Sequence, residues 1–275
     1  MTDHRVTDCR IAVLGQQIRV NVRAGTGVAL VLCNGIGASL DVLDPLIKHL
    51  DSDTTVVRFD APGIGGSANS PVPYGFPYLA ALLGRLLRRL RLDGPVDVLG
   101  FSWGGALAQQ FAFQNPRRCR RLILVSTATG AIMVPGRPSV LAKMLTPRRF
   151  MDQDYASANA GDLYGGAVRA DPSDVRGALN RQLTTGARMG YVYQLLAGSV
   201  WTSIFALPLI RQDTLIIAGT DDPIVPVMNA RIMAGLLPHA TVHLTDGGHM
   251  DLITDAAGLT PVIEAFRRSD RPAQR

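Results

Sequence analysis

The sequence has 275 residues, of which 47% are hydrophobic, 18% charged and 6% aromatic, and its formal net charge is +6 at pH 7. This apolar content excludes a mainly disordered chain, and the length predicts one domain or one domain with an inserted subdomain. The charge balance alone does not select a nucleic acid, a membrane surface or any other partner.

Three features of the sequence bear on where the protein works. The long uncharged stretches are broken by Gly, Pro or polar residues, so we expect no transmembrane helix of about 20 apolar residues. The N-terminus has no basic start followed by an apolar run, so we expect no secretion signal. Cys9, Cys33 and Cys119 lie far apart and match neither a disulfide framework nor a metal-ligand spacing. Together these features favour a reduced, cytoplasmic location.

Strand-like and helix-like segments alternate along the chain. An opening hairpin is predicted over 10–23, with its turn at 15–17, and it would add an antiparallel edge to a sheet. Leucines at helical spacing predict a helix over 79–92, and two further helices are expected over 106–114 and 229–237. The remaining predicted strands cover 28–33, 54–59, 96–99, 121–125, 214–218 and 242–244.

This alternation predicts an α/β fold with a mostly parallel central sheet and helices on both of its faces. From 130 to 209 the strand signal disappears, and helix-compatible segments are separated by Pro and Gly. We interpret this region as a helical cap inserted between two strands of the sheet. The predicted division is 1–129 for the first part of the core, 130–209 for the cap and 210–275 for the second part of the core.

The strongest chemical signal is a G-x-S-x-G motif formed by Gly100, Ser102 and Gly104. The predicted strand 96–99 precedes this motif, and a helix-forming segment follows it. A sharp strand-to-helix turn strains the backbone of the serine and exposes its hydroxyl, while small neighbours let the two arms approach each other. A Gly-rich phosphate loop is the alternative, but no Lys follows and G-x-G-x-x-G is absent. We therefore predict that Ser102 is a nucleophile.

A serine hydroxyl needs a general base, and the sequence offers five histidines. His4, His49, His239 and His243 are predicted to lie in the N-terminal tail, an early helix-like segment, a turn and the last strand. His249 instead lies in a loop after that strand, where the reactive groups of open α/β sheets gather. We therefore predict that His249 is the base.

The imidazole in turn needs an acidic residue that orients it. Asp221 and Asp222 both follow the predicted strand 214–218. Asp222 has the spacing G-x-x-D-x-x-x-P and is preferred, whereas Asp221 could cap the turn instead. The chain order Ser102, Asp222, His249 is the order found in α/β-hydrolases.

Backbone N–H groups that stabilise an oxyanion complete this chemistry. The N–H of Trp103 directly follows the serine at the start of a predicted helix. A Gly-rich loop over 34–37 follows an earlier strand and offers the N–H of Ile36 as the second donor, although an ordinary turn would have the same sequence. Asp60, in the Gly-rich loop 59–67, is interpreted as structural.

These motifs identify the chain as a member of the α/β-hydrolase superfamily, within which it resembles the intracellular medium-chain-length poly(3-hydroxyalkanoate) depolymerases. The catalytic serine, aspartate and histidine of that family fall on Ser102, Asp222 and His249. The resemblance covers nearly the whole chain, including the cap, but residues 150–162 and the arginine-rich stretch 85–91 match poorly. The matching segments are 34–38, 60–67, 102–111, 133–136, 163–166, 189–191, 194–195, 201–204 and 222–223.

The resemblance implies hydrolysis of a polyester to 3-hydroxyacids or oligomers through an acyl-enzyme, with no cofactor and no metal. It also implies a cytoplasmic location and contact with polyester granules. Nothing beyond net charge favours nucleic acid, and the sequence does not address the oligomeric state. Arginine pairs could contact an anionic granule surface, but solvated helix ends explain them as well. These pairs are 117–118, 120–121, 148–149 and 267–268.

Other functions remain open for the same machinery. A carboxylesterase or lipase would act on monomeric esters, and a cofactor-free haloperoxidase or a carbon–carbon hydrolase would share the fold. A hydrolase-fold receptor would bind small molecules without catalysis, although the complete set of serine, histidine and aspartate disfavours this reading.

Apolar and aromatic residues of the cap are candidates for a pocket that takes aliphatic side chains. Packing of the cap against the core would use the same residue types, so this alternative stays open. The pocket candidates are Met133, Met189, Tyr191, Leu195 and Trp201, with Met144, Met151, Tyr193 and Leu196 in the same region.

Overall fold

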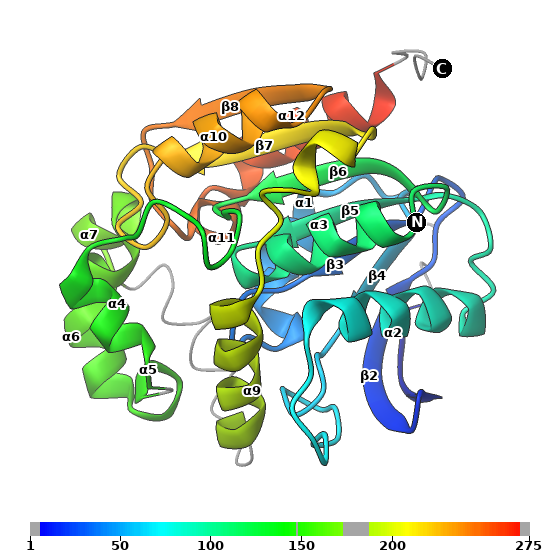
Figure 1. The fold of residues 1–275 in the computed structure, drawn as a ribbon, viewed down its shortest axis with the longest axis horizontal. Helices are drawn as coiled ribbons and strands as arrows, with labels where there is room; N and C mark the ends of the chain where they lie inside the picture. Colours follow the sequence, from blue (N-terminus) through cyan, green and yellow to red (C-terminus); the bar gives the residue numbers. More distant parts are fainter. Residues whose placement is uncertain (1–5, 147, 173–186, 270–275) are drawn as a thin grey trace.

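The computed structural model describes residues 6–146, 148–172 and 187–269 (Figure 1). The strands are β1 (Val6–Val13), β2 (Gln16–Arg23), β3 (Leu30–Cys33), β4 (Val56–Phe59), β5 (Val96–Phe101), β6 (Cys119–Val125), β7 (Asp213–Gly219) and β8 (Ala240–Thr245). In the described residues they form one eight-stranded sheet in the order β1-β2-β4-β3-β5-β6-β7-β8. Strand β2 pairs antiparallel with β1 and β4, and all other neighbours pair in parallel. The predicted α/β class and mostly parallel sheet are therefore confirmed.

Helices cover both faces of the sheet (Figure 1). These helices are α1 (Asp44–His49), α2 (Phe76–Arg89), α3 (Trp103–Gln114), α10 (Met228–Leu236), α11 (Asp251–Thr254) and α12 (Ala256–Arg268), with the short 3₁₀ helix η1 (Leu40–Leu43) before α1. One buried core lies under α2, α3 and α10, and a second lies under α1, α11 and α12. Strand β3 serves both, because Val31 belongs to the first core and Leu32 to the second. Such burial on both faces explains why the inner strands are apolar without a break.

Most predicted elements differ from the observed ones by a few residues at their ends, and two of these differences have a clear physical cause. The turn of the opening hairpin lies at Leu14 and Gly15, whose φ angles are 50° and 76°, and β2 begins at Gln16. Positive φ at both positions is what a two-residue hairpin turn requires, so the turn predicted at 15–17 was placed too late. Helix α2 begins at Phe76 instead of 79, because Pro77 fits the first turn of a helix, where no N–H partner is needed.

The regular elements that the structure describes between β6 and β7 are helices joined by loops. These helices are α4 (Pro138–Met144), α5 (Arg148–Met151), α6 (Gln153–Tyr164), α7 (Gly166–Ala170), α9 (Ala187–Val200) and the 3₁₀ helix η2 (Leu207–Leu209). A bridge between Gly130 and Thr202 is the one strand-like pairing in the described part of this segment. Residues 173–186 of the predicted cap lie outside the described residues, and the division of the chain into core and cap stays a prediction. None of the described helices has the length and apolar character that crossing a membrane requires.

Candidate active site

Ser102 lies at the turn from β5 into α3, with φ of 53° and ψ of −120°. Residues other than glycine rarely adopt such a positive φ. A Cβ atom on Gly100 would lie 2.5 Å from the carbonyl oxygen of Gly104. A Cβ atom on Gly104 would lie 2.1 Å from the carbonyl oxygen of Cys33 in β3. The two glycines of the motif therefore allow the strand, the helix and the neighbouring strand to meet at the serine.

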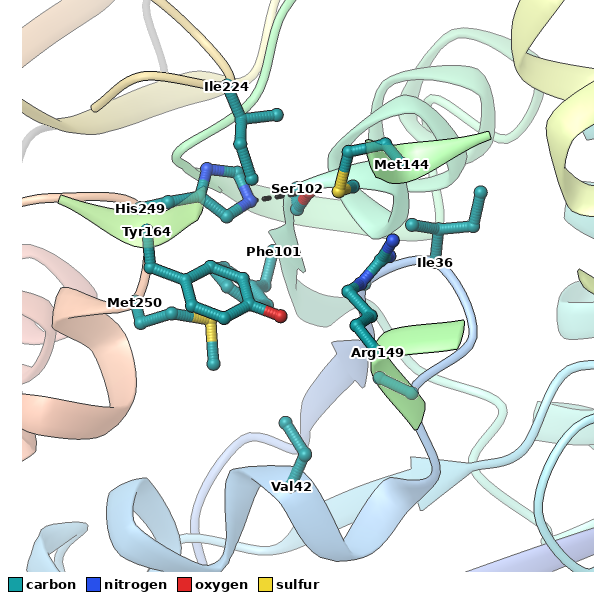
Figure 2. A pocket seen from close by; sticks show the side chains of 12 residues that line it. Ile36, Val42, Phe101, Ser102, Met144, Arg149, Tyr164, Ile224, His249 and Met250 are labelled. Atoms are coloured by element: carbon teal, nitrogen blue, oxygen red, sulfur yellow. Dashed lines mark hydrogen bonds between the residues drawn. The ribbon is translucent and has the colours of Figure 1, made fainter. Parts of the chain in front are cut away.

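Three side chains form a chain of hydrogen bonds, one directly after β5 and two in the loops that follow β7 and β8. Nε2 of His249 lies 2.9 Å from Oγ of Ser102 (Figure 2), and Nδ1 of His249 lies 2.7 Å from Oδ2 of Asp222. His249 and Asp222 are buried, with exposed fractions of 3% and 7%. The backbone N–H groups of Ile224 and Val225 each donate to Oδ1 of Asp222 at 2.9 Å. The carboxylate is thus fixed by the turn that follows it and held toward the imidazole.

Asp221, the alternative acidic residue, makes different contacts. Its carboxylate accepts a hydrogen bond from the N–H of Gly166 at 2.8 Å and forms an ion pair with Arg169 at 3.0 Å. The hydrogen bond from Gly166 and the charge of Arg169 lower the pKa of this carboxyl. Of the two neighbours, the structure joins Asp222 to His249 and joins Asp221 to α7.

The loop that carries His249 is fixed by contacts on both sides. Oδ1 of Asp251 accepts from the N–H of Gly248 at 2.7 Å, and its Oδ2 accepts from the hydroxyl of Thr245 at 2.6 Å. Burial raises the pKa of Asp251. The N–H of His249 donates to the carbonyl oxygen of Tyr164 at the end of α6, at 2.7 Å. Asp251 was not among the predicted site residues, although an acidic side chain shortly after the histidine loop is a typical partner for loop N–H groups.

The predicted oxyanion donors lie beside the serine. Ile36 borders the same cavity as Ser102, and a Cβ atom on Gly35 would lie 3.6 Å from Cβ of Ser102. Trp103 opens α3, so its N–H belongs to the first helical turn, where no acceptor within the helix exists. The roles of Ile36 and Trp103 as donors stay predictions.

Gln194 on α9 contacts the surroundings of both predicted donors, although it was not among the predicted site residues. Its Oε1 accepts from the N–H of Gly37 at 2.7 Å, and its carbonyl oxygen accepts from Nε1 of Trp103 at 2.9 Å. No local pattern in the sequence signals a contact of this kind, because it links segments that are far apart in the chain.

A cavity of about 370 Å³, including its solvent-open mouth, lies beside Ser102 (Figure 2). Its wall is mostly apolar, with polar groups only from Ser102, His249, Tyr164 and Arg149 among the described side chains. Such a wall suits an aliphatic ligand that presents a few oxygen atoms. The apolar side chains on the wall are Ile36, Ala38, Val42, Phe101, Met144, Ile224 and Met250.

The pocket residues that we predicted lie elsewhere. None of Met133, Met189, Tyr191, Leu195 and Trp201 is on the wall of this cavity. Met189 is 51% exposed, Tyr191 on α9 is fully buried in the second core, and the indole of Trp201 donates to Gln110. Met144, from the wider set, does line the cavity. Helical spacing predicts which residues share a face, but it does not predict in which direction that face points.

This arrangement provides the groups that acyl transfer requires. The imidazole of His249 can take the proton of the Ser102 hydroxyl, and the carboxylate of Asp222 can stabilise the resulting imidazolium. Residues 6–146, 148–172 and 187–269 contain no cluster of three or more His, Cys, Asp or Glu side chains that could hold a metal ion.

Comparisons with known proteins give a consistent result. Residues 28–256 match the family described as alpha/beta hydrolase fold. A poly(3-hydroxyalkanoate) depolymerase of Ectopseudomonas oleovorans is 46% identical over 258 residues, which cover 93% of this chain and 90% of that protein. The enol-lactonase from Burkholderia xenovorans LB400 has a TM-score of 0.81 at 22% identity, covering 94% of this chain and 100% of that one. A hydrolase from Pseudomonas aeruginosa PA01 has a TM-score of 0.82 at 22% identity, covering 96% and 99%.

Proposed function

Because this chain belongs to the alpha/beta hydrolase family and is an ester hydrolase similar to poly(3-hydroxyalkanoate) depolymerases, we propose that it cleaves medium-chain-length poly(3-hydroxyalkanoate). The products are 3-hydroxyacids or short oligomers. The observation that carries the reaction type is the hydrogen-bond chain from Ser102 through His249 to Asp222. The identity of 46% along nearly the whole chain supports the substrate class.

The first half of the reaction forms an acyl-enzyme. His249 takes the proton of Ser102 through Nε2 while Oγ attacks the carbonyl carbon of the ester. Asp222 orients the imidazole and stabilises its positive charge. The N–H groups of Ile36 and Trp103 stabilise the negative oxygen of the tetrahedral intermediate. When this intermediate collapses, the carbon–oxygen bond to the alcohol part breaks, and His249 gives its proton to the leaving oxygen.

The second half of the reaction uses water. His249 takes a proton from a water molecule, whose oxygen attacks the acyl carbon. The second tetrahedral intermediate collapses, Ser102 Oγ leaves and regains the proton, and the carboxylic acid is released. One ester and one water molecule thus give one acid and one alcohol, and the chain's own side chains carry every proton.

We also infer that the enzyme acts in the cytoplasm at the surface of polyester granules, because an insoluble polymer is accessible only at its surface. Co-sedimentation of the purified protein with isolated granules measures this association. Protein that stays in the supernatant at all granule concentrations would contradict it.

Product analysis tests the proposed function. Dispersions of medium-chain and short-chain polyesters are incubated with the wild-type protein and with Ser102→Ala, and the released acids are quantified. We expect 3-hydroxyacids or oligomers from the medium-chain polymer with the wild type and none with the variant, at equal thermal stability. A wild-type protein that hydrolyses p-nitrophenyl esters but releases nothing from either polymer would be a carboxylesterase on monomeric esters instead.

A further inference from the structure

Arg149 on α5 places a cation in the wall of the cavity beside Ser102. Arg149 is 3% exposed, and Figure 2 shows its guanidinium directed toward Ser102 and Met144. From the sequence, we interpreted 148–149 as one of several exposed arginine pairs, either at solvated helix ends or facing an anionic granule surface. That interpretation fits Arg148, whose side chain is 61% exposed, but it is wrong for Arg149.

Contacts with two tyrosines hold Arg149 in this place. Nη1 of Arg149 donates to the hydroxyl of Tyr191 at 2.9 Å, and that hydroxyl donates to the carbonyl oxygen of Met144. The guanidinium carbon lies 5.4 Å from the centre of the Tyr191 ring. Tyr164, which also lines the cavity, is close enough that the charge of Arg149 counteracts the burial that raises its pKa. The guanidinium is therefore pre-positioned by residues of α4, α6 and α9.

Acyl transfer and aliphatic binding do not account for a cation at this position. Ser102 and His249 carry out the chemistry, and the apolar wall suits alkyl groups. A guanidinium is a planar donor that recognises carboxylate and carbonyl oxygens. Every repeat unit of a 3-hydroxyacid polyester carries a carbonyl group. The repeat unit next to the cleaved ester therefore always presents a carbonyl oxygen, which belongs to the next ester bond inside the polymer or to the carboxylate at the polymer's end.

We propose that Arg149 binds the carbonyl oxygen of the repeat unit adjacent to the ester that is cleaved. Arg149 thereby selects oxygenated polyesters over simple alkyl esters, as a specificity-determining residue that takes no part in proton transfer. This inference rests on the proposed function and names the chemical group of the substrate that the site recognises.

The test compares kcat/KM for three esters in the full-length protein. They are the dimer of 3-hydroxyoctanoate as free acid, the same dimer as methyl ester, and p-nitrophenyl octanoate, which has no second carbonyl. The readout is the ratio of kcat/KM for each dimer to kcat/KM for p-nitrophenyl octanoate. With Arg149→Met, we expect this ratio to fall about tenfold or more for both dimers. The free acid should lose more than the methyl ester, because its bond to Arg149 is charge-assisted on both sides.

Two further variants make the result decisive. Arg148→Met changes the exposed neighbour on the same helix and should leave all three values of kcat/KM unchanged. Arg149→Gln retains a donor for Tyr191 and serves as the test if Arg149→Met does not fold. With Arg149→Gln, we expect the ratio of kcat/KM for each dimer to that for p-nitrophenyl octanoate to fall at least about threefold.

The outcomes separate this inference from the proposed function. Equal losses of kcat/KM on all three esters would mean a purely structural role for Arg149. Unchanged kcat/KM on all three esters would mean that Arg149 makes no contact with the substrate, and either result overturns the inference alone. A wild-type protein that hydrolyses p-nitrophenyl octanoate but neither dimer would overturn the proposed function together with the inference.

Discussion

Oε1 of Gln194 accepts a hydrogen bond of 2.7 Å from the backbone N–H of Gly37, and this bond ties helix α9 to the loop that carries Ile36. The carbonyl oxygen of the same glutamine accepts the indole N–H of Trp103 at 2.9 Å. Gln194 is 1% exposed. One buried residue of α9 thus fixes the surroundings of both proposed oxyanion donors, which makes Gln194 a positioning residue.

Replacing Gln194 should therefore affect the transition state more than substrate binding. For Gln194→Leu we expect kcat to fall about ten- to a hundredfold while KM changes less than about threefold, because the loop loses the bond that fixes it. Gln194→Glu retains an acceptor oxygen and should restore most of kcat. Steady-state kinetics with p-nitrophenyl octanoate measure both. A raised KM at unchanged kcat would instead show that Gln194 shapes the binding site.

The neighbouring residues Asp221 and Asp222 offer a matched pair of variants. Asp222→Asn should lower kcat by about 10³- to 10⁴-fold, because an amide neither orients the imidazole correctly nor stabilises its charge. Asp221→Asn removes the exposed ion pair between Asp221 and Arg169, which is worth at most about 1 kcal/mol. This variant should keep kcat within about twofold of the wild-type value. The same kinetic assay compares them. A larger loss for Asp221→Asn would reassign the acidic role.

The glycines of the motif predict a contrast in stability. Gly104→Ala puts a Cβ atom 2.1 Å from the carbonyl oxygen of Cys33, and we expect the free energy of unfolding to fall by about 3 kcal/mol. Gly235 in α10 has no atom within 4 Å of an added Cβ atom. Gly235→Ala should therefore raise the free energy of unfolding by about 0.5 to 1 kcal/mol. Urea unfolding measures both values, and equal effects of the two substitutions would contradict the close approach at Gly104.

Asp60 predicts a dependence of stability on pH. Burial raises its pKa to about 6, although the N–H groups of Leu40 and Gly66 donate to the carboxylate. Because this folded-state pKa lies above the unfolded value of 3.8, the contribution of Asp60 to stability is complete only below about pH 4, and it is lost as the pH rises through 6.

Asp60→Asn removes this titration. Between pH 4.5 and pH 7, the free energy of unfolding of the variant should therefore gain about 2 kcal/mol relative to the wild type. Urea unfolding of both proteins at the two pH values gives this difference, and any effect of the amide that does not depend on pH cancels. A difference that is the same at both pH values would contradict a raised pKa of Asp60.

The fold and the candidate catalytic residues were predictable because they depend on local sequence. The alternation of strands and helices predicted an α/β fold with a mostly parallel sheet, which the observed sheet confirms. The motifs around Ser102 predicted membership of the α/β-hydrolase superfamily, which the family match confirms. Gly100, Ser102 and Gly104 lie within one turn, so the small residues that the turn requires are recognisable as a short sequence motif. Asp222 and His249 each lie in the loop that follows a strand, and parallel strands bring such loops to one edge of the sheet.

The wall of the cavity was not predictable in the same way. Arg148 and Arg149 are adjacent and chemically identical, yet one is exposed and the other is buried, because helix α5 directs successive side chains to different sides. The bond between Gly37 and Gln194 spans 157 positions in the chain. Contacts of this kind depend on how the helices between β6 and β7 pack onto the sheet. Local sequence patterns do not predict this packing.

Labelling with a fluorophosphonate tests most directly whether Ser102 is the nucleophile, because this reagent forms a covalent bond only with an activated serine. After incubation and proteolysis, mass spectrometry should find one adduct, on the peptide that contains Ser102. The adduct should be absent in Ser102→Ala and form far more slowly in His249→Ala. A folded wild-type protein that acquires no adduct, or acquires it on a different serine, would contradict the proposed mechanism.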